Sequence, residues 1–450
     1  MAVVQSRDTI AAIATSSGRG AIGIVRISGS DAFALAEQLT GRILPAPRMA
    51  GLRYCLGADG EPIDQGLLLC FPGPNSFTGE DIVEFQGHGG HVILHMIWQR
   101  LITLGARPAR PGEFSERAYL NGRIDLAQAE AIADLIDAGS RQAARAALRS
   151  LRGDFSTKVE SLRTRLIALR VELEAAIDFS DEDDVDAFAS QRFERALADT
   201  SAALATLLVE AEQGRRLAQG AVMVIGGAPN VGKSSLLNRL AGDDMAIVTP
   251  VAGTTRDLLR TDVVLEGLPL RIIDTAGIRE TSDVVEREGV ARARQAMRQA
   301  DLIVLMDVAG EAALADTLPN DLPPQTPVLH LRNKIDLSGD QPGYAPGNTF
   351  MGISVLTGAG MEILTTELVR LLGGSPSNES TFTARARQIE ALRQSAVALD
   401  AARLVLTQGL GIELLAEELR HAHDHLGVIT GQVTPDQLLG EIFSTFCIGK

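Results

Sequence analysis

The stretch that most constrains this 450-residue chain is Gly227 to Ser234, which matches the phosphate-loop pattern G-x-x-x-x-G-K-[ST]. The apolar run 222–225 before it predicts a strand, and residues 235–240 after it predict a helix. In that context the loop amides and the helix N-terminus can bind phosphate, Lys233 can reach the outer phosphates, and the Ser234 hydroxyl can hold magnesium. A glycine turn that merely joins the strand to the helix is the alternative. The pattern predicts an α/β nucleotide-binding domain.

Two segments that follow the loop have the order and composition of GTPase switches. Gly253-Thr-Thr-Arg-Asp predicts Thr255 as a second magnesium ligand in a loop that senses the γ-phosphate. Asp274-Thr-Ala-Gly follows a predicted strand at 270–273. It places the Asp274 carboxylate near a magnesium-bound water and the Gly277 amide near the γ-phosphate.

Two later segments predict that the base is guanine. Asn333-Lys-Ile-Asp follows a predicted strand at 328–331, and Asp336 in it can accept two hydrogen bonds from the guanine edge. Adenine cannot supply these hydrogen bonds, so the carboxylate would stay unpaired against the wrong base. The segment 354–360, Ser-Val-Leu-Thr-Gly-Ala-Gly, is predicted to close the base pocket. All segments in this order favour GTP over ATP.

The residue after the Asp-x-x-Gly segment bears on the hydrolytic mechanism. Many GTPases have a glutamine there that orients the attacking water, but here the residue is Ile278, which cannot do so. The local candidates for catalytic help are Glu286 and Arg279, or a monovalent cation. Glu286 is the better candidate for a water-orienting base, because a carboxylate can accept a proton and a guanidinium cannot. A helix-start acid is the alternative role for Glu286.

Composition limits the class of protein. A net charge of −15 argues against a chain covered in positive charge for wrapping nucleic acid, although a local basic patch is compatible with it. The three cysteines lack disulfide or metal-site spacing, which fits a reducing compartment. No apolar stretch approaches the ~18 residues of a membrane span, and the N-terminus lacks a secretory signal. We expect a cytoplasmic protein without a membrane-spanning segment.

The periodicity predicts a multidomain chain. Residues 1–118 read as a mixed α+β domain and residues 119–215 as the first half of an all-α helical domain. Residues 216–374 alternate between strands and helices, as in a doubly wound α/β sheet, and residues 375–450 are helical again. The economical interpretation is a nucleotide domain inserted into one helical domain whose two halves pack together.

Three further patterns in the sequence are weaker indicators of function. Gly18, Gly20 and Gly23 fit a dinucleotide-binding pattern, but a strand follows where a helix would be required. The histidines around His88 and those from 421 to 425 favour a structural or substrate-contacting role over a metal site. The arginine-rich stretch 141–170 is either a solvated helix face or a basic stripe for RNA phosphates.

Long strings outside the nucleotide motifs carry a family resemblance. They include Pro-Gly-Pro-Asn-Ser-Phe-Thr-Gly-Glu-Asp from residue 72, Gln-Gly-His-Gly-Gly from residue 86, Arg-Pro-Gly-Glu-Phe-Ser-Glu-Arg-Ala from residue 110, and the closing Phe-Cys-Ile-Gly-Lys. With the GTPase segments, they make the whole chain resemble the bacterial tRNA-modification GTPases called MnmE or TrmE. The resemblance implies an N-terminal folate-binding domain that also forms a homodimer, and an inserted G domain that pairs in a potassium-dependent way.

The resemblance also implies a reaction and its partners. Together with a flavoprotein resembling MnmG, in a heterotetramer, such a GTPase uses a tetrahydrofolate one-carbon unit to build an aminomethyl-type group on the wobble uridine of certain tRNAs. An alternative function is a GTP-regulated RNA-binding switch in ribosome assembly, against which the folate-type strings and the C-terminal tail argue.

The resemblance assigns residues by matching position. The expected catalytic residues are Glu286, Lys233 and Cys447. The expected folate residues are Arg26, Glu84, Arg123 and Lys450. The expected magnesium ligands are Ser234 and Thr255, and the expected potassium ligands are Asn230, Thr249, Val251 and Thr254. Together with the motifs it predicts a GTP site of Asn230, Val231, Gly232, Lys233, Ser234, Ser235, Thr249, Thr254, Thr255, Asp274, Thr275, Ala276, Gly277, Asn333, Lys334, Asp336, Ser354, Val355 and Leu356.

Two positions depart from the family pattern. Pro250 stands where aspartate is usual in the potassium loop, which stiffens the loop but keeps the carbonyls. Arg123 stands where lysine is common at the folate site, so a salt contact is expected to persist with altered reach.

Overall fold

The computed structural model describes the chain in segments that form two compact units. The described residues are 8–16, 18–178, 186–242, 260–274, 295–309, 322, 326–345, 349–372, 382–432, 436–447 and 449. The first unit comprises Met1–Ala133 and His423–Lys450, and the second comprises Asp134–Ala422.

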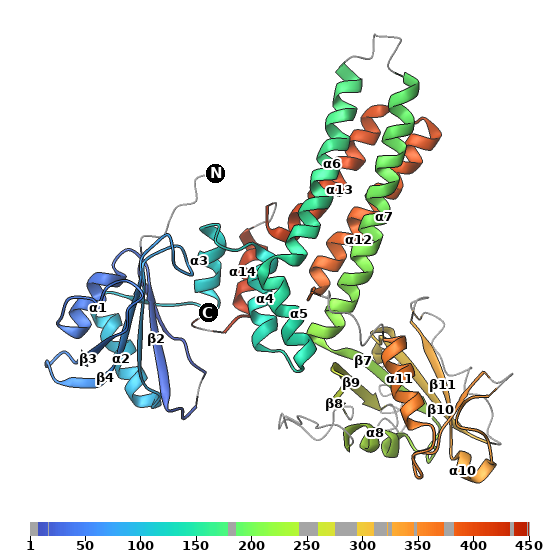
Figure 1. The fold of residues 1–450 in the computed structure, drawn as a ribbon, viewed down its shortest axis with the longest axis horizontal. Coiled ribbons are helices and arrows are strands. Elements are labelled where there is room, and N and C mark those ends of the chain that lie inside the picture. Colours follow the sequence, from blue (N-terminus) through green and yellow to red (C-terminus); the bar gives the residue numbers. More distant parts are fainter. Residues whose placement is uncertain are drawn as a thin grey trace, which may run out of the picture. The chain divides into compact units, whose positions relative to one another are not determined.

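A six-stranded sheet forms the framework of the first unit. Its order is β3 (Gly51–Leu56), β4 (Pro62–Phe71), β5 (Ile82–His88), β2 (Ile22–Ser28), β1 (Ile10–Ile13), β6 (Arg107–Pro108). All neighbours are antiparallel except β1 and β6. Helices α1 (Ala32–Thr40) and α2 (His91–Leu104) bury their apolar sides against this sheet in one core (Figure 1). The mixed α+β character predicted for this part of the chain is confirmed.

The C-terminal segment packs inside the same unit. Helices α3 (Glu113–Leu120) and α4 (Leu126–Ile136) follow β6 in the chain, and α14 (Asp436–Ser444) lies near the C-terminus. A small apolar core joins Leu126 and Ala129 of α4 to Phe443 and Phe446 at the end of the chain. The chain terminus is therefore held against residues near position 120 by burial of aromatic side chains.

Long helices form one part of the second unit. They are α5 (Arg141–Arg152), α6 (Asp154–Asp178), α7 (Asp186–Gln219), α12 (Ala386–Gln408) and α13 (Ile412–Thr430), of which α13 continues past the unit boundary. Helix α7 packs against α5, α6 and α12 (Figure 1). Because α12 follows the nucleotide domain and the other three precede it, both helical stretches belong to one assembly.

The chain returns to this assembly through three close contacts. The Phe382 ring stacks on Phe155 with ring centroids 4.7 Å apart. Ser150 Oγ donates to the Thr383 carbonyl at 3.0 Å and accepts from its amide at 2.8 Å. These groups are buried, so they hold residues 382–383 firmly against α5 and α6.

A seven-stranded sheet forms the nucleotide domain. Its order is β12 (Gly343–Tyr344), β13 (Met351–Gly352), β11 (Val328–Asn333), β10 (Leu302–Val308), β7 (Ala221–Gly227), β9 (Leu268–Asp274), β8 (Arg260–Leu265). The five inner strands are parallel and the two outermost pairs are antiparallel. Helices α8 (Lys233–Gly242) and α11 (Met361–Leu371) share one core with the sheet, and residues 296–300 share another; α10 (Ile335–Ser338) follows β11. The predicted doubly wound α/β sheet is confirmed, and so is the multidomain fold class.

Both connections to the nucleotide domain lie close together. Arg216 Nη1 donates to the Leu372 carbonyl at 2.8 Å, which joins the end of α7 to the residue after α11. Asp301 at the start of β10 accepts from Arg215 and, at 2.9 Å, from the Val222 amide. Arg215 and Arg216 at the end of α7 therefore bind the nucleotide domain through an ion pair and a hydrogen bond.

Removing the Phe382 ring is expected to destabilise the second unit. The ring is fully buried, so Phe382→Ala should lower the free energy of unfolding by about 3 to 5 kcal/mol. The measurement is the urea midpoint by circular dichroism. Val171→Ala, at a position in α6 that is 59% exposed, is the control and should change the free energy by less than about 0.5 kcal/mol. An unchanged midpoint for Phe382→Ala would contradict the role of this contact.

Candidate functional sites

The phosphate loop joins β7 to α8 through backbone conformations that suit glycine. Gly227 and Gly232 have φ of 153° and 104°, and a Cβ on Gly232 would lie 2.3 Å from Asn333 Nδ2. Asn230, at the loop tip, is exposed and has φ of 63°. These conformations allow successive backbone amides of the loop to face one anion, as a phosphate site requires.

The two polar side chains at the start of α8 lie where the phosphate chemistry is predicted. Lys233 is buried, and its ammonium donates to the carbonyls of Gly227 at 2.8 Å and Ala228 at 2.7 Å. Ser234 Oγ lies 3.5 Å from Oδ2 of Asp274, a fully buried carboxylate at the end of β9. A hydroxyl beside a buried carboxylate is an oxygen pair of the kind that magnesium prefers.

The residues predicted to bind the base lie beside this loop. Asn333 is buried, donates to the Val231 carbonyl at 2.8 Å and accepts from the Val355 amide at 3.0 Å. Lys334 Nζ donates to the Asn230 carbonyl at 2.9 Å. Asn333 thus braces the phosphate loop against the loop of residues 354–356, a role that the sequence motif did not reveal.

The predicted guanine-reading carboxylate has a defined orientation. Ser354 Oγ is buried and donates to Oδ1 of the exposed Asp336 at 2.5 Å. In the loop that Ser354 begins, Val355 is buried and Leu356 is 83% exposed. Arg239 of α8 donates to the Val355 carbonyl at 2.8 Å and so ties this loop to the helix of the phosphate loop.

Several predicted residues lie outside the described part of the chain. They are Thr249, Pro250, Val251, Thr254, Thr255, Thr275, Ala276, Gly277, Ile278, Arg279 and Glu286, together with Lys450 at the C-terminus. Their predicted roles stay predictions. The described members of the GTP site, which also include the exposed Ser235, come from the loop after β7, the start of α8, the ends of β9 and β11, α10 and the loop after β13.

Two predicted folate residues form an ion pair in the first unit. Arg26 of β2 and Glu84 of β5 are register partners, and Arg26 Nε donates to Glu84 Oε1 at 2.8 Å. Arg26 also donates to the carbonyl of Gly449 at 3.3 Å and lies 5.6 Å from the centre of the Phe114 ring. Arg123 is exposed and lies against the turn at Gly79.

The C-terminal tail is held close to this pair. The Gly112 amide donates to the Cys447 carbonyl at 3.3 Å. Gly112 has φ of 67°, and a Cβ there would lie 2.5 Å from the Phe443 carbonyl oxygen. The Cys447 thiol is exposed. The fold therefore brings the predicted tail cysteine and the predicted folate pair into one domain, although Arg26 and Gly449 of the tail are 423 residues apart along the chain.

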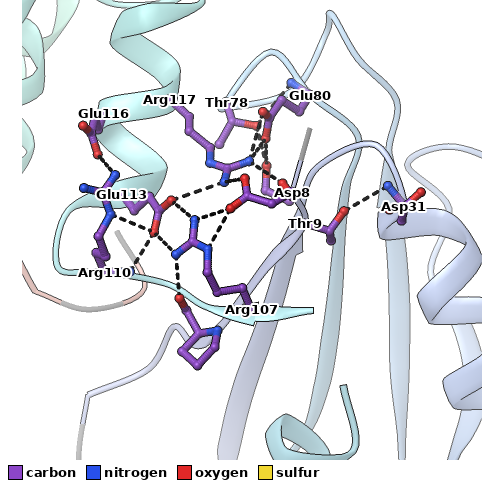
Figure 2. Close-up of polar contacts among 12 residues, drawn as sticks. Asp8, Thr9, Asp31, Thr78, Glu80, Arg107, Arg110, Glu113, Glu116 and Arg117 are labelled. Carbon is purple, nitrogen blue, oxygen red and sulfur yellow. Dashed lines mark hydrogen bonds and ion pairs between the residues drawn. The ribbon is translucent and has the colours of Figure 1, made fainter. Parts of the chain in front are cut away.

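A network of ion pairs supports the loop on which the tail rests. Figure 2 shows Arg107 between two carboxylates, 2.6 Å from Glu113 and 2.7 Å from Asp8. Arg117 lies 2.8 Å from Asp8 and 3.1 Å from Glu80. Because Glu113 also accepts from the Arg110 amide at 2.7 Å, the network fixes the loop that contains Gly112.

The network strongly favours the charged form of Glu113. Burial by itself would raise the pKa of this carboxyl. The hydrogen bonds from Arg107 and the Arg110 amide outweigh burial and lower its pKa to about 2. The pKa of Asp8 is lowered as well, since the hydrogen bond from Arg107 and the charge of Arg117 together exceed the effect of burial. The sequence offers no local sign of these pairs, since Asp8 and Arg107 are 99 residues apart.

Comparison with known proteins covers the whole chain. The family described as MnmE helical domain matches residues 126–447, and that described as GTP-binding protein TrmE N-terminus matches residues 9–123. The tRNA modification GTPase MnmE of Methylococcus capsulatus is 50% identical over 446 residues, 99% of each chain. The chain belongs to the MnmE family of tRNA modification GTPases. A second MnmE, of Pseudomonas aeruginosa, is 52% identical over 452 residues, 98% of this chain and 99% of its own.

A solved structure resembles part of the chain. Era of Aquifex aeolicus bound to GDP and AlF4− is 30% identical, with 39% of this chain and 66% of that chain covered and a TM-score of 0.26. This likeness has no part in the family assignment.

MnmE membership confirms the predicted family and enzyme class, a GTP hydrolase in tRNA modification. The relatives favour a GTP hydrolase in tRNA modification over the alternative of a GTP-regulated RNA-binding switch in ribosome assembly. Within the described segments, no helix is long and apolar enough to cross a membrane.

The histidine-rich loop of this MnmE-family chain has an acidic partner. His88 Nδ1 lies 2.7 Å from Asp64 Oδ1, and its amide donates to Asp64 Oδ2 at 2.8 Å. In the described part of the chain, no group of three or more His, Cys, Asp or Glu side chains is arranged to hold a metal.

Neutralising Glu113 is expected to change how stability depends on pH. Its pKa is lowered on folding, so its contribution is complete above about pH 4.5 and is lost as the pH falls towards 2. Glu113→Gln should destabilise the first unit at pH 7 by about 3 to 5 kcal/mol, because two arginines lose a buried partner. Between pH 4.5 and pH 2, the free energy of unfolding of Glu113→Gln should also vary less than that of the natural chain.

Trp98 fluorescence provides the measurement. It is the only tryptophan of the chain, and its indole donates to the Ala11 carbonyl of β1 at 3.1 Å, so it reports on the first unit. Glu417→Gln, which removes an exposed pair with Arg420 in α13, is the control. Equal pH profiles for the natural chain and Glu113→Gln would refute the role given to the network.

Proposed function

We propose that this chain is a potassium-dependent GTPase that builds an aminomethyl or carboxymethylaminomethyl group at C5 of the wobble uridine of certain tRNAs. The carbon comes from a tetrahydrofolate derivative. The chain acts in the cytoplasm as a homodimer, together with an MnmG-like flavoprotein in a heterotetramer. GTP hydrolysis drives opening and closing of the paired G domains rather than the carbon chemistry itself.

The observation that carries the proposal is the meeting of separate GTPase segments at one edge of the parallel sheet. Lys233, Asp274 and Asn333 are buried there, and Asp336 is oriented by Ser354. Crevices at the carboxyl ends of parallel strands are where open α/β sheets bind ligands. The full-length MnmE relatives extend the proposal from nucleotide binding to tRNA modification.

Guanine specificity is assigned to Asp336. Its carboxylate can accept from both donors of the guanine edge, while Ser354 holds it in place from the other side. Asn333 contributes indirectly, because it keeps the base loop and the phosphate loop in contact.

Two cations fit the polar groups around the phosphate loop. Ser234 beside the buried Asp274 suits magnesium, with Thr255 as the second side-chain ligand. Asn230 at the exposed loop tip suits potassium, with Thr249, Val251 and Thr254 completing the cage. When bound, these cations offset charge on the phosphates. Glu286 orients the attacking water, since Ile278 cannot, and Lys233 stabilises charge on the outer phosphates.

The folate site is assigned to the Arg26–Glu84 pair. A guanidinium held by a carboxylate offers a donor and an acceptor side by side, which suits a pterin-type ring. The Gly449 carbonyl accepts a hydrogen bond from the same arginine, which supports assigning the tail residues Cys447 and Lys450 to the one-carbon unit. Arg123, which lies at the Gly79 turn, is assigned to a more distant part of the folate.

GTP hydrolysis is expected to depend on the alkali ion. Turnover should be much faster in potassium than in sodium at equal ionic strength, because the smaller ion fits the cage less well. The measurement is phosphate release by the full-length chain. Equal rates in the two salts would remove the potassium mechanism.

Glu286→Ala should abolish turnover in potassium while leaving GTP affinity unchanged, because the carboxylate acts on water and not on the nucleotide. The measurement combines phosphate release with calorimetric titration of GTP. Turnover that survives the change would assign the base elsewhere.

The proposed reaction is tested by mass spectrometry of wobble nucleosides. Cells that lack this chain should lose the modified uridine, and the natural gene should restore it. Cys447→Ser should fail to restore it while hydrolysing GTP normally in vitro, because the thiol lies in a different domain from the nucleotide site. Unchanged wobble nucleosides in cells that lack the chain would refute the proposed function.

A further inference from the structure

Helix α5 carries a row of arginines on one side only. At about 100° per residue, Arg141, Arg145 and Arg152 fall within an arc of about 40°, and all three are exposed. The opposite side consists of the buried Ala143, Ala146, Ala147 and Ser150. The helix contains no acidic residue.

These three arginines differ from most of the arginine-rich stretch. Arg163 is buried and pairs with Glu160 at 2.9 Å, and Arg170 lies 3.6 Å from Glu174. Among the described residues, Arg141, Arg145 and Arg152 have no carboxylate partner and no side-chain hydrogen bond. The structure therefore separates the arginines with partners, such as Arg163 and Arg170 of α6, from the row Arg141, Arg145 and Arg152 on α5.

The row stays without a carboxylate partner although the chain is acidic. The net charge is −15, so carboxylates are abundant, yet none pairs with these three cations in the described part of the molecule. Arg141 also lies in the first turn of α5, where a positive charge opposes the helix dipole. An external anion bound by the row would offset this unfavourable placement.

We propose that the row Arg141, Arg145 and Arg152 on α5 binds the phosphate backbone of the tRNA. The proposal rests on the proposed function, which supplies the RNA. With 1.5 Å of rise per residue, the three side chains leave the helix at intervals of about 6 and 10 Å, so they can contact successive phosphates along one strand. Such contacts position the RNA and do not read its sequence.

The row is also connected to the nucleotide domain. Gln142, the neighbour of Arg141, donates to the carbonyl of Glu266 in the turn between β8 and β9 at 3.3 Å. A Cβ on Gly267 in that turn would lie 2.8 Å from the Gln142 side chain. RNA bound on α5 therefore lies on a helix that contacts the G domain directly.

The test is the salt dependence of tRNA binding by the full-length chain. The variant changes Arg141, Arg145 and Arg152 to glutamine, which keeps helix propensity. A matched control changes Arg192, Arg195 and Arg403, exposed arginines of α7 and α12, and so removes the same charge. Affinity is measured by fluorescence anisotropy of labelled tRNA over a salt series, and GTP hydrolysis without tRNA verifies folding.

The α5 variant should bind more weakly, and its slope of log affinity against log salt should be smaller in magnitude by about 2 to 3, roughly 0.7 to 0.9 per lost contact. The control variant should keep the slope of the natural chain. Equal slopes for all three proteins would overturn the inference, and so would equal losses in both variants. A natural chain that binds no tRNA would also overturn it, while the wobble-nucleoside assay would still judge the proposed function separately.

Discussion

The return of the chain at residues 382–385 to helices α5 and α6 is the constraint on which the arrangement of the second unit depends. Phe382 stacks on Phe155, Thr383 exchanges hydrogen bonds with Ser150, and Arg385 pairs with Asp134 at 2.7 Å. These contacts make one helical assembly from two distant stretches, between which the G domain lies in the sequence, and Arg216 of α7 binds the carbonyl of Leu372 after α11. A movement of the G domain would act on α7 through this hydrogen bond, as the proposed opening and closing of the G domains requires.

The first unit depends on a comparable return of the chain. Aromatic side chains near the C-terminus fill a core with α4, and the loop at Gly112 leaves no room for a Cβ. The carboxylate of Glu113 then fixes that loop through Arg107. Burial of the aromatic side chains stabilises the docked tail. The ion pairs fix the loop that the tail contacts, because an ionised carboxylate with several donors favours one arrangement. The proposed chemistry of Cys447 requires such a position beside Arg26.

Much of the fold and part of the site followed from the sequence. The phosphate loop, the strands before Asp274 and Asn333 and the alternation of the G domain were all predicted, since each depends on short-range backbone preferences. The arginine stretch 141–170 does not act as one feature in the structure. Arg163 pairs with Glu160 and is buried by packing, whereas the row on α5 is exposed and pairs with no carboxylate of the described segments. The brace formed by Asn333 and the network around Glu113 were not foreseen, as neither leaves a local pattern.

By itself, the sequence determined the family, the order of the nucleotide motifs and the fold class, because a motif needs only neighbouring residues to define its backbone and its chemistry. Only the tertiary structure decided that the tail meets Arg26, that Asn333 joins two loops of the nucleotide site, and that three arginines remain unpaired on α5. These features join residues from about 20 to more than 400 positions apart, or depend on which side of a helix is covered. Packing of whole elements sets such relations, and no local preference of the chain encodes them.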